Sequence, residues 1–229
     1  MLNFFLFVIF PYVAIAILLV VSLHRYFNNS YKFSSLSSEF LESEQLFWGS
    51  VPWHYGIMGV LVGHVIGFCF PREVLAFGSV PVRLLIIEAT ALMFGLMSLF
   101  GLIVLIRRRM TDSRVRVVTS RMDMFILFLL LVQVMSGVGT AIFYRWGINW
   151  YATSMVPFLK SLMMLNPELL FIKSMPHLVK LHVFNAFLII AVLPFTRLLH
   201  FLVLPISYIW RSWQKVIWNY DRKSYRKTK

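Results

Sequence analysis

The sequence has very little cysteine and little acidic charge. Cys69 is the only cysteine among 229 residues, and it lies within an apolar run. One thiol excludes an intrachain disulfide, and it excludes an iron–sulfur cluster or zinc site built from thiolates of this chain alone, because such sites need several. Charged residues make up 14% of the chain and hydrophobic residues 59%. In soluble domains about 25% of the residues are charged and about 45–50% are apolar. An ordinary soluble globular protein is therefore excluded.

Long apolar runs are what the sequence has instead. Five of them reach about 20 residues, the length that an α-helix needs to cross the roughly 30 Å hydrocarbon core of a bilayer. The first is predicted to be a retained anchor and not a signal peptide, because no basic residue precedes it. We predict an all-α integral membrane protein, a single domain over residues 1–229 with a bundle of five transmembrane helices: Phe4–Leu23, Val51–Phe70, Leu84–Ile106, Met122–Tyr144 and Leu178–Leu204.

The basic residues predict the orientation of the bundle. Cytoplasmic segments of membrane proteins carry an excess of lysine and arginine, so the net charge of +13 is interpreted as loop charge and not as a sign of nucleic-acid binding. With the N-terminus outside, 15 of the 22 basic residues lie inside and six lie outside. The connection from Arg107 to Arg121 and the basic tail from about residue 205 decide this count. We predict an outside N-terminus and a cytoplasmic C-terminus in the cytoplasmic (inner) membrane.

The segment from Arg145 to His177 is long for an outside connection. It contains apolar pieces such as 'SMVPFLKSLMML', and it begins with the aromatic residues Trp146, Trp150 and Tyr151, which suit the membrane interface. We predict an interfacial helix lying over the bundle. A disordered loop is the alternative.

Four histidines lie in the predicted spans. His54 and His64 belong to the second, in 'WHYGIMGVLVGH', and His182 and His200 lie near the two ends of the fifth. An ionisable side chain inside a membrane is costly and indicates function, and neutral imidazole is a good axial ligand for haem iron. The pattern predicts two haems. Polar interhelical hydrogen bonds and a proton path without metal are the alternatives.

The directions of the helices predict how these histidines pair. The second span runs from inside to outside and the fifth from outside to inside, so antiparallel packing places His64 beside His182 near the outer face and His54 beside His200 near the inner face. Along a continuous helix the second span separates its histidines by about 15 Å and the fifth by about 27 Å, or about five turns. Tilt, the extent of a haem and a bend at Pro194 must absorb the difference of about 12 Å.

Glycines recur beside the candidate ligands in the second span. Small residues let either a macrocycle or another backbone approach a helix closely. The sequence alone leaves both interpretations open for these positions, which are Gly56, Gly59, Gly63 and Gly67.

Together these residues resemble the gamma subunit of respiratory nitrate reductase, a membrane dihaem cytochrome b. The resemblance covers nearly the whole chain, and its most specific parts are the H-x9-H of the second span, 'RVRVVTSRMD' before the fourth, and 'KLHVFNAFLIIAVLPFTRLLHFLVLP' in the fifth. It implies five transmembrane helices and two b haems, with His64 and His182 holding the distal haem iron and His54 and His200 the proximal one.

The resemblance also implies partners and a direction of electron flow. Quinol, either menaquinol or ubiquinol, would be oxidised near the outer haem and release its protons outside. Its electrons would pass inward to an iron–sulfur beta subunit and then to a molybdenum-containing alpha subunit, both docked on the cytoplasmic face. The chain would thus be the quinol-oxidising, electron-transfer subunit of the enzyme and not its nitrate-reducing subunit.

The expected quinol site departs from the family in one residue. The family commonly has a lysine near the outer start of the third helix, and this chain has 'VPVRLLIIEATALMFG' there. Arg83 is the nearest cation, although it is equally explained as an interfacial anchor. Glu88 is a membrane carboxylate that could accept a proton from quinol.

Arginines near the inner face are candidates for binding haem propionates. Arg197 is the better candidate, because it lies one turn before His200 and loop charge does not explain it. The run from Arg107 to Arg109 has the same possible role, but it is equally explained as a topology determinant or as a contact for an acidic partner.

Two other functions remain open at this point. A dihaem quinone-linked subunit of a sulfur or heterodisulfide redox complex would share the histidines and differ in its partner. A membrane anchor or transporter without haem would use the histidines for packing or proton movement. Nitrate rests on the resemblance alone, since a fold does not specify a substrate.

Overall fold

The computed structural model describes residues 1–28 and 44–198 of the chain. Within those two ranges every regular element is helical. Five helices are long and apolar enough to cross a membrane, which confirms the predicted number of spans: Leu2–Asn28 (α1 and α2 with the turn between them), Glu44–Cys69 (α3), Pro81–Thr111 (α5), Arg121–Phe143 (α7) and His177–Phe195 (α11 and its last turn). Short helices join them: Pro71–Gly78 (α4), Ser113–Val117 (α6), Gly147–Trp150 (α8), Val156–Met163 (α9) and Leu170–Lys173 (α10).

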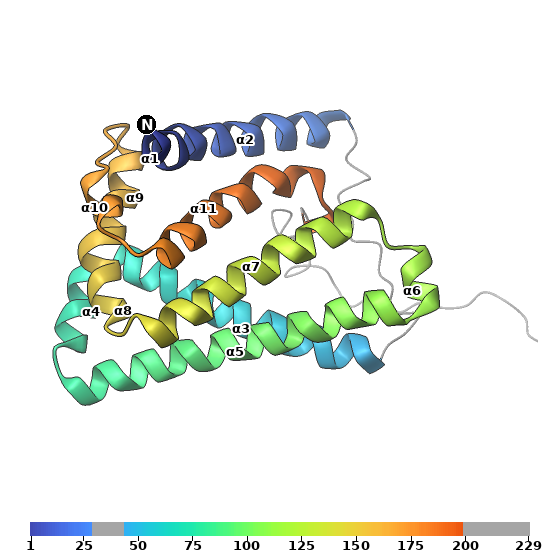
Figure 1. The fold of residues 1–229 in the computed structure, drawn as a ribbon, viewed down its shortest axis with the longest axis horizontal. Helices are drawn as coiled ribbons and strands as arrows, with labels where there is room; N and C mark the ends of the chain where they lie inside the picture. The colour runs from blue at the N-terminus through green and yellow to red at the C-terminus, as the bar shows by residue number, and fades with distance from the viewer. Residues whose placement is uncertain (29–43, 199–229) are drawn as a thin grey trace, which may run out of the picture.

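The long helices lie side by side in an up-and-down bundle (Figure 1). Contacts run from α2 (Phe10–Asn28) to α11 (His177–Val192), then to α7, α5 and α3. Figure 1 places the N-terminus, α4, α8, α9 and α10 at one end of the bundle and α6 at the other. This topology brings the two connections rich in short helices to the end predicted to lie outside.

Glycines set the closest approach in the bundle, between α3 and α5. A Cβ on Gly101 would lie 2.4 Å from the backbone nitrogen of Trp53, and a Cβ on Gly56 would lie 2.6 Å from that of Ser98. No side chain larger than hydrogen fits at such distances without moving a backbone. These two helices therefore pack through their main chains, as small residues allow inside membranes.

Two widened helical turns precede prolines. Phe5–Ile9 and Tyr151–Met155 are π-helical, and each ends two residues before a proline, Pro11 or Pro157. Proline has no N–H and its ring collides with the preceding turn. A single wide turn takes up the mismatch without breaking the helix.

The fifth helix ends earlier than the sequence predicts. α11 stops at Val192, Leu193–Phe195 forms a 3-10 turn, and Thr196 is extended at φ −108° and ψ 171°. The prediction of one continuous helix to Leu204 is therefore wrong at Thr196, and residues 199–204 lie outside the described part of the chain. Pro194 starts this break because it cannot donate the next helical hydrogen bond.

Side chains stabilise the end of this helix. The Arg25 side chain on α2 donates to the carbonyl oxygen of Pro194, and the Thr196 hydroxyl donates to the carbonyl of Leu193. The Leu193 carbonyl also accepts from the backbone N–H of Thr196 across 3.1 Å. As a consequence, the separation of about 27 Å, expected along one continuous helix from His182, no longer applies, and His200 lies outside the described residues.

The connection between α5 and α7 is short and well capped. Asp112 caps α6 by accepting from the backbone N–H groups of Arg114 and Val115. The pKa of Asp112 lies below its ordinary value, and the hydrogen bond from Val115 is the largest cause. Ser120 and Asp123 then form a reciprocal capping box at the start of α7.

The segment after α7 is helical, as predicted, and lies across the end of the bundle in Figure 1. Phe158 on α9 and Ile172 on α10 are completely buried, and they belong to a core that also contains Phe7 of the first span and Phe187 of α11. The Tyr12 hydroxyl donates to the carbonyl of Leu162 across 2.9 Å. The segment is thus part of the core and not a disordered loop.

Candidate functional site

The structure brings two of the predicted ligands together. The imidazole of His64 on α3 faces that of His182 on α11, with ring centroids 6.4 Å apart and ring planes inclined by 29°. The helices that carry them are not neighbours in sequence, and the pairing is the one that helix direction predicts. Their role as ligands stays a prediction.

The separation of the two rings is close to that of two imidazoles bound to one metal atom, although Nε2 of His182 lies 3.1 Å from the side-chain amide nitrogen of Gln133. An imidazole nitrogen binds a transition metal at about 2.0–2.1 Å, and the ring centroid lies roughly 1 Å beyond it, so two opposed ligands have centroids about 6 Å apart. In the part of the chain that is described, no three side chains of His, Cys, Asp or Glu gather around a metal site. Two opposed imidazoles are the axial ligands that a haem iron takes.

Ring hydrogen bonds orient the histidines of α3. Nδ1 of His64 lies 2.8 Å from the carbonyl oxygen of Val60, and Nδ1 of His54 lies 2.7 Å from that of Ser50. Because a carbonyl only accepts, these contacts assign the proton to Nδ1 in both rings. Nε2 then keeps its lone pair, which is the arrangement found in metal-binding histidines.

The glycines of α3 divide between two roles. Gly59 lies against the Phe94 ring and Gly67 against the Tyr151 ring, where a Cβ would approach within 2.6 Å and 2.8 Å. Gly56 lies against α5, so three of the four positions serve helix packing. A Cβ on Gly63 would meet nothing within 4 Å, so the surface beside His64 is open. Only Gly63 has room for a flat cofactor.

The hydrogen-bond partners of the His182 ring lie on α7 and not on its own helix, α11. Its Nδ1 lies 3.1 Å from the carbonyl oxygen of Gln133 and 3.0 Å from the hydroxyl of Ser136. The side-chain amide of Asn185 donates to the side-chain oxygen of Gln133 across 2.9 Å. Sequence reasoning missed these three polar residues, although polar side chains inside apolar spans could have identified them.

Tyr151 covers the other side of the pair. Its hydroxyl donates to the carbonyl oxygen of His64 across 3.1 Å, and its ring meets the imidazole edge-on with centroids 5.5 Å apart. Burial, first of all, raises the pKa of the phenol to about 12, so the hydroxyl stays a donor at neutral pH. The sequence predicted Tyr151 only as an interfacial aromatic residue.

The two candidate quinol residues have protein partners. The guanidinium carbon of Arg83 lies 5.2 Å from the centroid of the Phe77 ring, and the side chain is exposed. Glu88 accepts a hydrogen bond of 2.9 Å from the backbone N–H of Gly147, directly after Trp146, whose φ is +65°. Glu88 therefore holds the start of α8 through one of its carboxylate oxygens.

The end of the bundle that holds α6, which is predicted to lie inside, is more charged. Nε of Arg197 lies 3.6 Å from Oδ1 of Asp123, with 40% and 10% of the two side chains exposed. Arg108 is buried, with 1% exposed, and Arg109 donates to the hydroxyl of Thr119. His54 is exposed, and its predicted partner, His200, lies outside the described residues.

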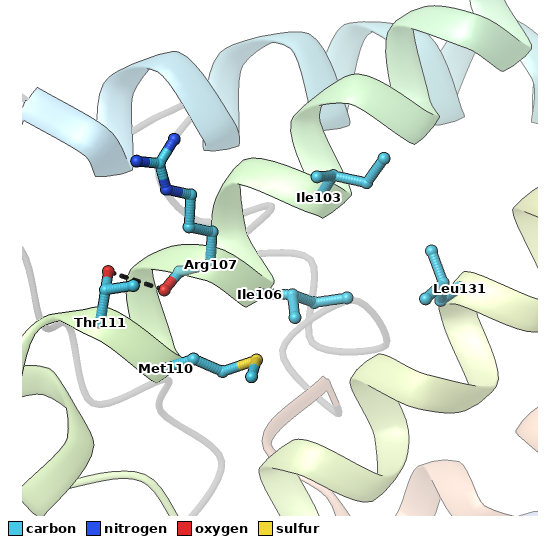
Figure 2. A pocket seen from close by; sticks show the side chains of 6 residues that line it. All are labelled: Ile103, Ile106, Arg107, Met110, Thr111 and Leu131. Carbon is cyan, nitrogen blue, oxygen red and sulfur yellow. Dashed lines mark hydrogen bonds between the residues drawn. The ribbon is translucent and has the colours of Figure 1, made fainter.

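An apolar pocket of about 310 Å³ lies between α5 and α7 near the same end. In Figure 2, Ile106 and Met110 point toward Leu131, and the guanidinium of Arg107 points away from them. The Thr111 hydroxyl donates its hydrogen to the carbonyl of Arg107 across 2.9 Å, so it could act toward a ligand only as an acceptor. The pocket lacks the polar groups of a catalytic site.

Five long apolar helices with opposed histidines at one level define a multi-pass membrane protein with a candidate bis-histidine centre. The chain belongs to the nitrate reductase gamma subunit family, whose model matches residues 3–219. It is 30% identical to the nitrate reductase gamma chain of Bacillus subtilis over 90% of this chain and 93% of that one. It is also 30% identical to the respiratory nitrate reductase 1 gamma chain of Escherichia coli, over 94% of this chain and 97% of that one. It is thus a membrane subunit of an oxidoreductase complex.

Proposed function

We propose that this chain is the dihaem cytochrome b subunit that oxidises quinol and delivers the electrons to the other subunits of a nitrate reductase. The opposition of His64 and His182 is the observation that carries the proposal. These two residues hold the distal iron, and His54 and His200 hold the proximal one. When bound, the two b haems supply one-electron carriers at two depths of the membrane.

The proposed quinol site lies at the end of the bundle that holds α4 and α8. Glu88 accepts a proton from the substrate hydroxyl, and Arg83 supplies positive charge beside the oxygen that loses it. The hydrogen bond from Gly147 to Glu88 keeps one carboxylate oxygen in place. The protons leave on the outer side, since the arginine-rich end is the cytoplasmic one.

The proposed partners dock at the arginine-rich end. An iron–sulfur beta subunit takes the electrons there, and a molybdenum-containing alpha subunit reduces nitrate. Arg107, Arg114 and Arg116 are exposed around α6, and they offer positive charge to an acidic surface. Arg197 is the proposed partner of a proximal haem propionate, and Asp123 holds its guanidinium group.

The test is a haem assay with reduced-minus-oxidised spectra on the complex, comparing His64→Leu and His182→Leu with the parent chain. We expect two b haems in the parent and one in each variant, with no reduction of the remaining haem by quinol. His24→Gln is the matched control, because His24 is exposed and its ring nitrogens lie near the amide of Asn28.

A parent complex without haem would contradict the proposal and favour a membrane anchor or transporter. Haem that dithionite reduces and quinol does not would retain the four ligands and refute the roles of Arg83 and Glu88. Reduction by quinol with electron delivery to a sulfur compound and not to nitrate would favour the related redox complexes.

A further inference from the structure

His182 is oriented differently from the other candidate ligands that the structure describes. His54 and His64 turn Nδ1 to a carbonyl oxygen four residues back in their own helix, α3. His182, on α11, turns Nδ1 to two acceptors on α7, the carbonyl of Gln133 and the hydroxyl of Ser136. A movement between α7 and α11 would therefore rotate one ligand and leave the others in place.

The Ser136 hydroxyl is arranged to accept a hydrogen bond from His182. It is 3% exposed and donates its own hydrogen to the carbonyl oxygen of Gln133 across 3.0 Å. Its lone pairs are then left for the N–H of His182, 3.0 Å away. Gly137 completes this contact surface, because a Cβ there would lie 3.0 Å from Cε1 of the imidazole.

Asn185 fixes the position of α11 along α7. It is 3% exposed, and its amide donates to the carbonyl of Leu129 and to the side-chain oxygen of Gln133, both across 2.9 Å. His182 and Asn185 lie three residues apart on α11, and their carbonyl acceptors Gln133 and Leu129 lie four residues apart on α7. One turn of each helix is thus hydrogen-bonded to the other, which fixes both sliding and rotation.

We infer that Ser136 and Asn185 are positioning residues that set the reduction potential of the distal haem and leave that of the proximal haem unchanged. This inference rests on the proposed function. Ser136 acts on the Nδ1 proton of His182, and a hydrogen bond from that proton makes the imidazole a stronger electron donor. A stronger donor stabilises oxidised iron and lowers the potential. Asn185 acts by keeping the ring at its acceptors.

Packing alone would also require these polar groups to be paired, since buried polar atoms are hydrogen-bonded in nearly all proteins. The two explanations differ in what a substitution changes. A packing role affects stability and the amount of haem retained. A positioning role changes the potential of one haem while both haems remain bound.

The test is a redox titration of both haems in the complex, with the proximal haem as the internal reference. In Ser136→Ala we expect a more positive distal potential. At the parent midpoint, the ratio of reduced to oxidised distal haem rises about two- to tenfold, the change equivalent to one hydrogen bond. In Asn185→Leu we expect an altered low-spin ferric spectrum of the distal haem, because its ligand plane is released.

Thr140→Val is the matched control. Thr140 carries a buried hydroxyl on α7, one turn after Ser136, and this hydroxyl donates to the carbonyl of Ser136. We expect both potentials of this variant to equal those of the parent. An unchanged distal potential in Ser136→Ala with both haems bound, or equal shifts in Thr140→Val, would overturn the inference. A parent complex without haem would instead overturn the proposed function.

Discussion

The two ends of the bundle hold their candidate haem residues in different ways. At the end predicted to lie outside, called the outer end below, His64 and His182 form uncharged hydrogen bonds that cross between helices, to α7 and to the segment after it. At the end predicted to lie inside, called the inner end, the hydrogen bonds of His54 within the described residues are to Ser50, on its own helix, and the ion pair of Arg197 with Asp123 joins α7 to the segment after α11. An inner ligand on a single helix tolerates movement of its neighbours, whereas the outer pair depends on the register of three segments.

The largest effect should come from removing the inner ligand. We expect His54→Leu to lose the proximal haem and to stop electron delivery to the partner subunits, while quinol still reduces the distal haem, since no described contact joins His54 to the outer pair. Spectra of the complex reduced by quinol measure both effects. Loss of both haems in this variant would show that the two ends are not independent.

A second comparison concerns two glycines near the candidate sites. Gly101→Ala places a methyl group 2.4 Å from the backbone of Trp53, and the displacement of α3 from α5 should cost about 3 kcal/mol. Gly63→Ala meets no atom within 4 Å, so the haem-free protein should be as stable as the parent.

The measurement is the unfolding of both variants in detergent, followed by haem content. If Gly63 borders the distal haem, Gly63→Ala should lower haem occupancy without lowering the stability of the protein. Equal haem content in Gly63→Ala and the parent would contradict a cofactor at that surface.

The sequence predicted the spans well because length and hydropathy are local properties. It also predicted that His64 meets His182, since helix direction follows from the order of the spans. It predicted only a bend at Pro194, whereas the helix ends there. The end of the helix is stabilised by Arg25, which reaches the Pro194 carbonyl from 169 residues away, and no local pattern predicts such a contact. Gln133 was visible as a polar residue, but its partner depends on the rotation of α7, which no local pattern determines.

A smaller effect is expected from the ion pair at the inner end. Asp123→Asn removes the charge opposite Arg197 and weakens the capping box with Ser120, so we expect a loss of about 1 kcal/mol in unfolding free energy. If Arg197 also binds a propionate, the proximal potential should shift and the distal potential should not. Asp112→Asn serves as a control, because it weakens a cap on α6 and removes a charge that faces Arg114.

The smallest effect should come from Tyr151→Phe, which sharpens the comparison at the outer end. The ring remains against Gly67 and His64, and only the hydroxyl bond to the His64 carbonyl is lost. Such a bond contributes about 0.5–1.5 kcal/mol to the free energy of unfolding. This one is partly open to solvent, so we expect a loss near the smaller of these two values. The distal potential should stay as in the parent, since Nδ1 of His64 is bonded to Val60 and not to Tyr151. A shift as large as that of Ser136→Ala would mean that Tyr151, too, positions a ligand, and that the outer pair is controlled from both sides.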